Sequence, residues 1–167
     1  MLARTRLELD DYLPYLVNRV GTIIADQFGA EALAAHGLSI AMWRVLAALA
    51  AQGNPRDGSQ RQIDLADLTS IDASTLSRLV SRLVQMGLVS RSRSARSNRE
   101  VAVKLSAKGN ALVGRLIPIA QDYEAAAIRG LAPQDLAVLK RCLRRVYANM
   151  KNREAAGAFL NRGRRVG

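Results

Sequence analysis

The segment 72–86, DASTLSRLVSRLVQM, has the pattern of an amphipathic helix with a defined beginning and end. Asp72 is a residue type suited to the N-cap, and Gly87 is suited to the left-handed position that follows a last turn. The apolar residues recur every three or four positions, so they form one stripe that can pack on a core: Leu76, Leu79, Val80, Leu83 and Met86. The rest of the chain has to supply that core.

The opposite face of this helix is small, rich in hydroxyl groups and positively charged, and no carboxylate follows Asp72 in it. A face of this kind can enter a DNA major groove without steric conflict. An ordinary amphipathic surface helix is the alternative interpretation, and the flanking sequence has to decide between the two. The residues expected to meet bases or phosphates are Ser74, Thr75, Ser77, Arg78 and Arg82.

A short helix is expected immediately before this segment. Residues 54–60, NPRDGSQ, have the composition of a loop, and residues 62–68 then favour a helix with Leu65 and Leu68 facing inward. The connector 69–71 is short. A short helix, a tight turn and a longer helix with a polar outer face form a helix-turn-helix.

Two short strands are expected after Gly87, at 88–91 and 100–105, where Val101, Val103 and Leu105 alternate. Residues 92–99 between them are polar and basic, with Arg93, Arg96 and Arg99. We interpret this segment as a two-stranded hairpin with a positive tip, the wing of a winged helix. Such a tip can place arginine in an adjacent minor groove. The alternative is a solvated loop.

The remaining segments favour helices. Residues 9–28 predict one helix, in which Pro14 is tolerated near the start, and residues 30–37 predict a break. Ser39 is a cap for a second, very apolar helix. Residues 107–129 predict a long helix that Pro118 should bend. One face of that helix is expected to carry Leu112, Leu116, Ile119 and Tyr123.

The last helix has a narrow apolar seam with alternating steps of three and four residues. Such a seam needs a partner helix, and a winged-helix module offers no obvious place for it. We therefore expect a homodimer, with residues 1–37 and 106–160 as dimerisation helices, 38–105 as the DNA-binding lobe, and 161–167 as a frayed basic tail. The seam residues are Leu136, Leu139, Leu143, Val146 and Met150.

The net charge of +11 indicates a polyanionic partner, either nucleic acid or an anionic membrane surface. No apolar run reaches the length of a membrane span, and the N-terminus lacks a signal peptide's apolar block, so we expect a cytoplasmic protein without a membrane partner. Aromatic residues make up only 4% of the chain, which argues against single-strand recognition by stacking. Double-stranded DNA is the expected partner.

The order of these elements resembles the MarR family of bacterial transcriptional regulators. The resemblance rests on MWRVLAAL at 42–49, STLSRLVSRLVQMGLVSR at 74–91, LSAKGNAL at 105–112 and GLAPQDLAVLKRCL at 130–143. It implies a mainly α-helical winged helix-turn-helix with a small β-hairpin wing and a homodimer on a palindromic operator. The family's wing often shows an Asp-x-Arg-Asp-x-Arg pattern. Here both arginines, Arg96 and Arg99, are present, but Ser94 and Ser97 replace the aspartates that help to orient them.

The resemblance also implies a small effector bound between the dimerisation helices and the DNA-binding lobe. Arg19 could pair with a carboxylate or phosphate while aromatic rings line an apolar slot. The segment LPYLVNRVG is similar to regulators of aromatic-acid catabolism, which implies an aromatic acid or its coenzyme A thioester. The alternative is that the aromatic residues belong to the core or the interface and Arg19 is a surface cation. The candidate residues are Tyr12, Tyr15, Asn18, Arg19, Trp43 and Arg44.

Other chemistries have weaker support. Cys142 lies among arginines that could lower its pKa, so a thiol switch is one alternative, but its place beside the seam and the usual burial of free cysteines favour a structural role. His36 is the sole histidine, and neither it nor Cys142 has a catalytic or metal-site motif around it. We expect no enzyme activity, no metal and no cofactor. A sequence-independent basic protein that coats DNA remains a second alternative.

Overall fold

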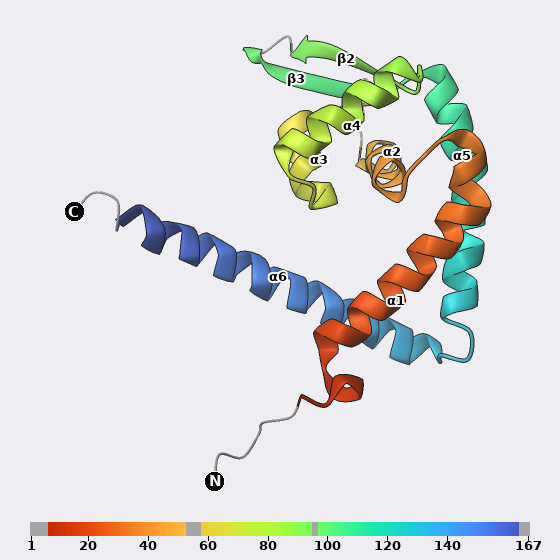
Figure 1. Cartoon of the computed structure of the whole chain (residues 1–167), viewed down its shortest axis with the longest axis vertical. Coiled ribbons are helices and arrows are strands. Elements are labelled where there is room, and N and C mark those ends of the chain that lie inside the picture. Colours follow the sequence, from red (N-terminus) through yellow and green to blue (C-terminus); the bar gives the residue numbers. More distant parts are fainter. Residues whose placement is uncertain (1–6, 53–57, 95–96, 164–167) are drawn as a thin grey trace. The chain divides into compact units, whose positions relative to one another are not determined.

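The computed structural model describes residues 7–52, 58–94 and 97–163, and the chain divides into two compact units, Met1–Glu124 and Ala125–Gly167 (Figure 1). The first unit contains the elements from η1 through most of α5, including the sheet, and the second contains α6. The elements in chain order are η1 (Leu9–Asp11), α1 (Leu13–Phe28), η2 (Gly29–Leu33), η3 (Ala34–His36), α2 (Ile40–Gln52), β1 (Ser59–Arg61), α3 (Gln62–Thr69), α4 (Ala73–Gln85), β2 (Val89–Ser94), β3 (Ser97–Leu105), α5 (Ala107–Ala127) and α6 (Pro133–Gly163).

The predicted first helix is present as α1, which begins with Pro14 in its first turn and is preceded by the short 3-10 turn η1. The predicted break at 30–37 is wrong. The backbone stays helical there, first as the π-helical η2 and then as the 3-10 helix η3. Ala32 and Leu33 are buried on this stretch, so packing keeps it helical. Gly37, with a φ of 64°, then ends it.

The centre of the first unit is α2. The Ser39 hydroxyl accepts a hydrogen bond from the backbone N–H of Met42 at 3.2 Å, which confirms the predicted cap. Val45 and Leu46 are completely buried, and Met42 and Leu49 are nearly so. Helices α3 and α4 pack against α2, so this helix supplies the core that the stripe of α4 needs.

The two helices of the helix-turn-helix lie where the sequence predicts them. Leu76, Val80 and Leu83 of α4 are completely buried, which confirms the apolar stripe. In α3 the prediction is only half right. Leu65 is completely buried, but Leu68 is 40% exposed, because the inward position one turn after Leu65 is taken by Thr69, whose hydroxyl bonds to the Leu65 carbonyl at 2.7 Å.

The wing belongs to a three-stranded antiparallel sheet in the order β1-β3-β2. The predicted hairpin is confirmed as the antiparallel pair of β2 and β3, but the third strand, β1, was missed because most of it was predicted as loop. Gln60 pairs with Val103 on one edge of β3, and Arg91 pairs with Val103 on the other. Val103 is completely buried, and Val101 and Leu105 pack partly against the core, which confirms the predicted alternation.

The start of α5 is tied to the junction between α4 and β2. The Ser106 hydroxyl donates to the Gly87 carbonyl at 2.6 Å, and the Ser106 backbone N–H donates to the Leu88 carbonyl at 3.0 Å. Gly109 lies so close to this junction that a Cβ on it would be 2.0 Å from the Leu88 oxygen. A side chain at this position is therefore incompatible with the observed packing.

The apolar face of α5 differs in one residue from the prediction. Leu112, Val113 and Leu116 are buried and Tyr123 packs partly against the core, but Ile119 is 39% exposed. The actual inward positions after Leu116 are Ala120 and Tyr123, at steps of four and three. The helix continues through Pro118.

In the second unit, α6 carries the predicted seam on its surface. Leu136 is half-buried, and the other seam residues are exposed: Leu139, Leu143, Val146 and Met150. The helix extends to Gly163, so the first three residues of the predicted frayed tail, 161–163, are helical, and residues 164–167 lie outside the described chain.

No single helix in the described part of the chain is long and apolar enough to cross a membrane. One pair, Leu13–His36 with Ile40–Ala51, meets the criteria of length and composition together but is bent by 82° between its halves. Much of α2 lies in the core of the first unit, which accounts for the apolar composition of the second half of this pair.

The close contact at Gly109 gives a stability prediction. We expect Gly109→Ala to lower the free energy of unfolding by about 1–3 kcal/mol, because its methyl group would overlap the Leu88 carbonyl. Gly114 lies in the same helix, and a methyl group added there would have nothing within 4 Å, so Gly114→Ala should be neutral or stabilising by up to about 1 kcal/mol. Urea unfolding followed by circular dichroism measures both. Equal effects of the two substitutions would contradict the packing described here.

Candidate nucleic-acid interface

The N-terminus of α4 is fixed by Asp72. Its Oδ1 accepts a hydrogen bond from the backbone N–H of Thr75 at 2.9 Å and another from the Ser74 hydroxyl at 2.6 Å. These bonds, the one from Ser74 first, hold the pKa of the Asp72 carboxyl well below its usual range. Asp72 is therefore ionised at neutral pH, and its two hydrogen bonds cap the first turn of α4.

The exposed face of α4 carries the residues predicted to meet DNA. Ser74, Arg78 and Arg82 are exposed, and Thr75 and Ser77 are half-buried. The Arg78 Nη2 donates to the Thr75 hydroxyl at 3.2 Å, which orients the guanidinium while leaving most of its donors free. The structure thus brings Thr75 and Arg78 together on the face opposite the buried stripe.

The hydrogen bonds of this face give each side chain a defined polarity. The Ser74 hydroxyl hydrogen is used in the bond to Asp72, so its oxygen offers lone pairs to a partner. Such an oxygen matches an amino group at a base edge, on cytosine or adenine. Arg78 offers only donors, and a guanidinium pairs in bidentate fashion with guanine. The face can therefore discriminate between bases.

The wing is linked to α4 by Arg91, which sequence reasoning missed. The Arg91 Nη2 donates to the Ser77 carbonyl at 3.2 Å, across fourteen positions of the chain. The basic composition of the wing gave no signal that this arginine faces the helix. Arg93 lies in β2 and Arg99 in β3, but their side chains and the whole of Arg96 lie outside what the structure describes.

The candidate effector residues fall into separate groups. The Arg19 guanidinium lies over the Tyr15 ring at 5.5 Å from its centroid, whereas Trp43 packs edge-on against Phe28 at 5.4 Å. Phe28 also meets Tyr123, whose hydroxyl bonds to Glu31, and this bond raises the pKa of Tyr123. Trp43 thus belongs to an aromatic cluster, and Tyr12 and Arg44 are exposed.

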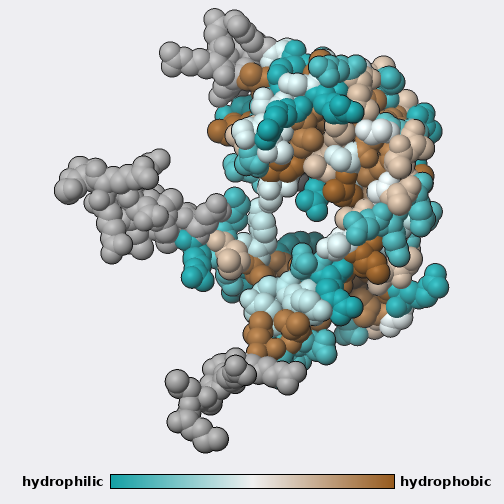
Figure 2. Space-filling model, in the orientation of Figure 1, coloured by the Kyte–Doolittle hydropathy of each residue, from teal (hydrophilic) through white to brown (hydrophobic). Residues whose placement is uncertain are grey.

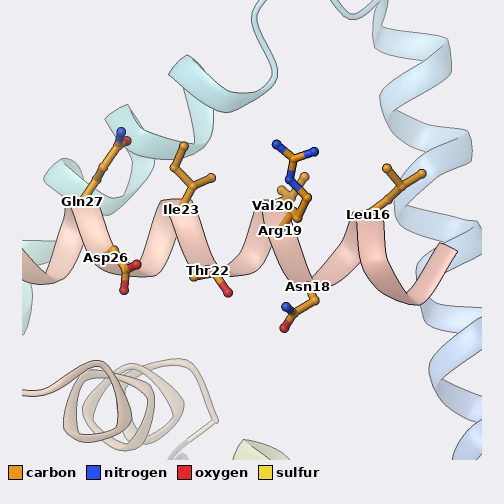
Figure 3. A pocket seen from close by; sticks show the side chains of 8 residues that line it. All are labelled: Leu16, Asn18, Arg19, Val20, Thr22, Ile23, Asp26 and Gln27. Atoms are coloured by element: carbon orange, nitrogen blue, oxygen red, sulfur yellow. The ribbon is translucent and has the colours of Figure 1, made fainter. Parts of the chain in front are cut away.

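A hollow of about 550 Å³ runs along α1 and includes two of the candidates, Asn18 and Arg19. All of its lining residues come from this one helix. Figure 3 shows Asn18, Thr22 and Asp26 on one side of the helix, whereas Arg19 and Ile23 point to the other side. The other lining residues are Leu16, Val20 and Gln27. One helix cannot enclose a ligand, so a complete site at this place needs a second wall.

Apolar side chains also lie at the surface along α1, where Figure 2 shows hydrophobic patches between hydrophilic ones. Val20 and Ile23 are 56% and 57% exposed. In the second unit, Cys142 is exposed, although burial was the argument for its structural role. Within the described residues, no group of three or more metal-ligating side chains could hold a metal ion.

Comparison with known proteins identifies the family. The model of the MarR family matches residues 36–100. A MarR-family transcriptional regulator from Silicibacter pomeroyi has a solved structure with 30% sequence identity and a TM-score of 0.74, and the match covers 84% of this chain and 91% of that one. This chain belongs to the MarR family. As a MarR-family protein it has the winged helix-turn-helix fold of DNA-binding transcriptional regulators.

Two further solved structures are similar. BpsR of Bordetella bronchiseptica shares 25% identity with a TM-score of 0.69, and the match covers 81% of this chain and 98% of BpsR. A variant of MarR from E. coli, solved in complex with operator DNA, has 24% identity and a TM-score of 0.69, and the match covers 80% of this chain and 92% of that one. At 24% identity, the similarity to the E. coli protein is a similarity of fold.

The cap of α4 gives a prediction that separates charge from hydrogen bonding. We expect Asp72→Ala to lower the urea midpoint at pH 7, because the Thr75 N–H loses its acceptor, while Asp72→Asn keeps an acceptor and loses less. Folding lowers the pKa of Asp72. The contribution of Asp72 to the free energy of unfolding is therefore complete above the pKa of the unfolded chain, about 4, and is lost as the pH falls from there toward the lower pKa of the folded protein. Wild-type protein and Asp72→Asn should therefore converge in acid. An undiminished difference at low pH would contradict this account.

Proposed function

We propose that this protein is a cytoplasmic homodimeric repressor that binds a palindromic operator and is released from it by a small aromatic carboxylate or its coenzyme A thioester. The observation that carries the proposal is the exposed face of α4. There, hydrogen bonds to Asp72 and Thr75 orient the Ser74 hydroxyl, whose oxygen can accept, and the Arg78 guanidinium, which can donate. The E. coli relative was solved on operator DNA. In our proposal α4 enters the major groove, and Arg93, Arg96 and Arg99 lie at the minor groove.

The homodimer is proposed because two helices expose apolar side chains at the surface. α1 exposes a stripe of aliphatic side chains in the first unit, and α6 exposes its seam in the second. A narrow seam of this spacing is typical of helix–helix association. Residues 1–37 and 106–160 then make the contact between protomers, and 38–105 form the DNA-binding lobe. Two α4 helices in a symmetric dimer read two half-sites about 34 Å apart.

The effector class is proposed from the resemblance and from one relative. DNA binding of BpsR is regulated by 6-hydroxynicotinic acid, an aromatic carboxylic acid. On this chain, Arg19 stacked on Tyr15 offers a cation beside a ring, and Asn18 lines the same hollow from the other side of α1. A partner helix at the dimer interface would supply the second wall that the hollow along α1 needs. Tyr12, Trp43 and Arg44 do not line the hollow and stay candidates on the resemblance alone.

Two other functions make different predictions. A basic coating protein would bind every duplex equally, whereas ordered groups on α4 favour discrimination. A thiol-switched regulator would act through Cys142, which is exposed. If oxidant releases the wild-type protein and Cys142→Ser from DNA to the same extent, Cys142 is not the switch. No enzymatic activity is part of the proposal.

Arg78 gives the test of base reading. We expect Arg78→Ala to weaken operator binding by about 1–3 kcal/mol and to relax the preference for guanine at one position of each half-site. Fluorescence anisotropy on operator duplexes with single base-pair substitutions measures both effects. Arg144→Ala is the control, since Arg144 lies outside α4 and the wing and off the seam of α6. A uniform loss over all duplexes would assign Arg78 to phosphate and contradict base reading.

The seam of α6 gives the test of the dimer. We expect the double variant Leu139→Gln/Leu143→Gln to raise the dimer dissociation constant at least tenfold, because it removes apolar side chains from the contact. Sedimentation velocity over a concentration series measures this. The matched control, Arg141→Gln/Arg144→Gln, changes the same helix off the seam and should leave the dimer intact. A monomeric wild-type protein at every concentration would refute the proposal.

A further inference from the structure

Arg91 belongs to β2 but contacts α4, so it stands between the two elements proposed to meet DNA. Its Nη2 donates to the Ser77 carbonyl at 3.2 Å, and the Ser81 hydroxyl donates to the same oxygen at 2.9 Å. Ser77 and Ser81 are about one helical turn apart and half-buried, whereas Arg91 is exposed. The guanidinium is therefore held at the surface beside α4, where β2 packs on this helix (Figure 1).

The register of the sheet explains why Arg91 reaches α4. Arg91 pairs with Val103 in the antiparallel sheet, so the two side chains lie on the same face, and Val103 is completely buried. Val89, two positions earlier in β2, is also buried. Arg91 thus occupies a position that the alternation of β2 would give to an inward apolar residue, and its side chain reaches the surface along α4 instead.

The electrostatic surroundings of Arg91 suit an anionic partner. Residues 73–99 contain no Asp or Glu, and among the described residues no carboxylate forms an ion pair with Arg91. The bond to the neutral Ser77 carbonyl uses one of the five N–H donors of the guanidinium and leaves its charge uncompensated. A phosphate can accept two parallel bonds from the remaining donors.

We propose that Arg91 binds a phosphate of the DNA backbone that separates the major groove from the adjacent minor groove. This inference rests on the proposed function, in which α4 enters the first groove and the wing lies at the second. The backbone between the grooves then has to pass between α4 and the wing, where the Arg91 guanidinium lies. A phosphate contact carries no sequence information but fixes the register of a protein on the duplex. Arg91 is thus a positioning residue for the base contacts of α4.

The first test compares Arg91→Gln with the wild type by fluorescence anisotropy at several salt concentrations. The duplexes are the DNA upstream of the gene and a scrambled duplex of equal length. We expect Arg91→Gln to weaken binding to both duplexes by about tenfold, because a phosphate contact is independent of sequence. The slope of log affinity against log salt concentration should fall in magnitude by about 0.9 per protomer.

Two further variants serve as comparisons in the same titrations. Arg91→Lys keeps the charge without the forked geometry, so it should keep the wild-type salt slope and lose less affinity than Arg91→Gln. Arg115→Gln removes an equal charge from the exposed surface of α5, outside α4 and the wing, and should leave the salt slope unchanged.

The second test locates the phosphate. Single phosphates of the upstream duplex are replaced by uncharged methylphosphonates, and the loss of affinity at each position is measured for the wild type and Arg91→Gln. We expect the loss at one position of each half-site to disappear in Arg91→Gln, because the cation that binds there is absent. The losses at the other positions should remain. A purely structural role of Arg91 would not abolish the loss at a single position.

Two results would overturn the proposal: a wild-type salt slope in Arg91→Gln, or losses in Arg91→Gln that match the wild type at every position. Circular dichroism shows whether each variant is folded, and Arg91→Met, which has an uncharged side chain of similar length, replaces Arg91→Gln if that variant is unfolded. Equal binding of the wild type to both duplexes would refute the repressor proposal alone, because the salt slopes on the scrambled duplex still test the phosphate contact.

Discussion

The surface that we propose for DNA binding depends on the burial of one stripe of α4 against the core that α2 builds. Leu76, Val80 and Leu83 are completely buried, and each such side chain contributes about 1.5–3 kcal/mol relative to an exposed one. This burial fixes the rotation of α4 about its own axis. The serine, threonine and arginine side chains are consequently presented together on the opposite face.

The same burial makes the joint after α4 important. Gly87 has a φ of 71°, and Ser106 and Lys108 of α5 bond to the carbonyls of Gly87 and Met86. Arg91 bonds back from β2 to Ser77. α4, β2 and α5 are thus connected through a few hydrogen bonds.

Much of this was predictable because it depends on local signals. The Asp72 and Ser39 caps, the stripe of α4 and the alternation around Val103 each follow from spacing that one element imposes on its own residues. The elements that were missed depend on tertiary pairing. β1, with the sequence SQR, has no strand pattern and exists because Gln60 pairs with Val103. Likewise, η2 and η3 stay helical because Ala32 and Leu33 are buried there.

The site was predictable to a similar extent. The residues on the exposed face of α4 follow from the helix period, but their hydrogen-bond polarity depends on rotamers that no spacing rule gives. The bond from Arg91 to the Ser77 carbonyl was missed for the same reason. Leu68 and Ile119 were placed inward because either of two neighbouring positions satisfies the helix period, and only the packed core selects Thr69 and Ala120 over them.

The central claim, that α4 reads sequence, is tested most directly by anisotropy titration of the wild-type protein. The protein is titrated on the DNA upstream of its own gene and on a scrambled duplex of equal length at several salt concentrations. The account predicts binding to the upstream DNA that is about 10³-fold or more tighter, with two protomers per site. Equal affinity for both duplexes at every salt concentration would contradict it and favour a protein that coats DNA.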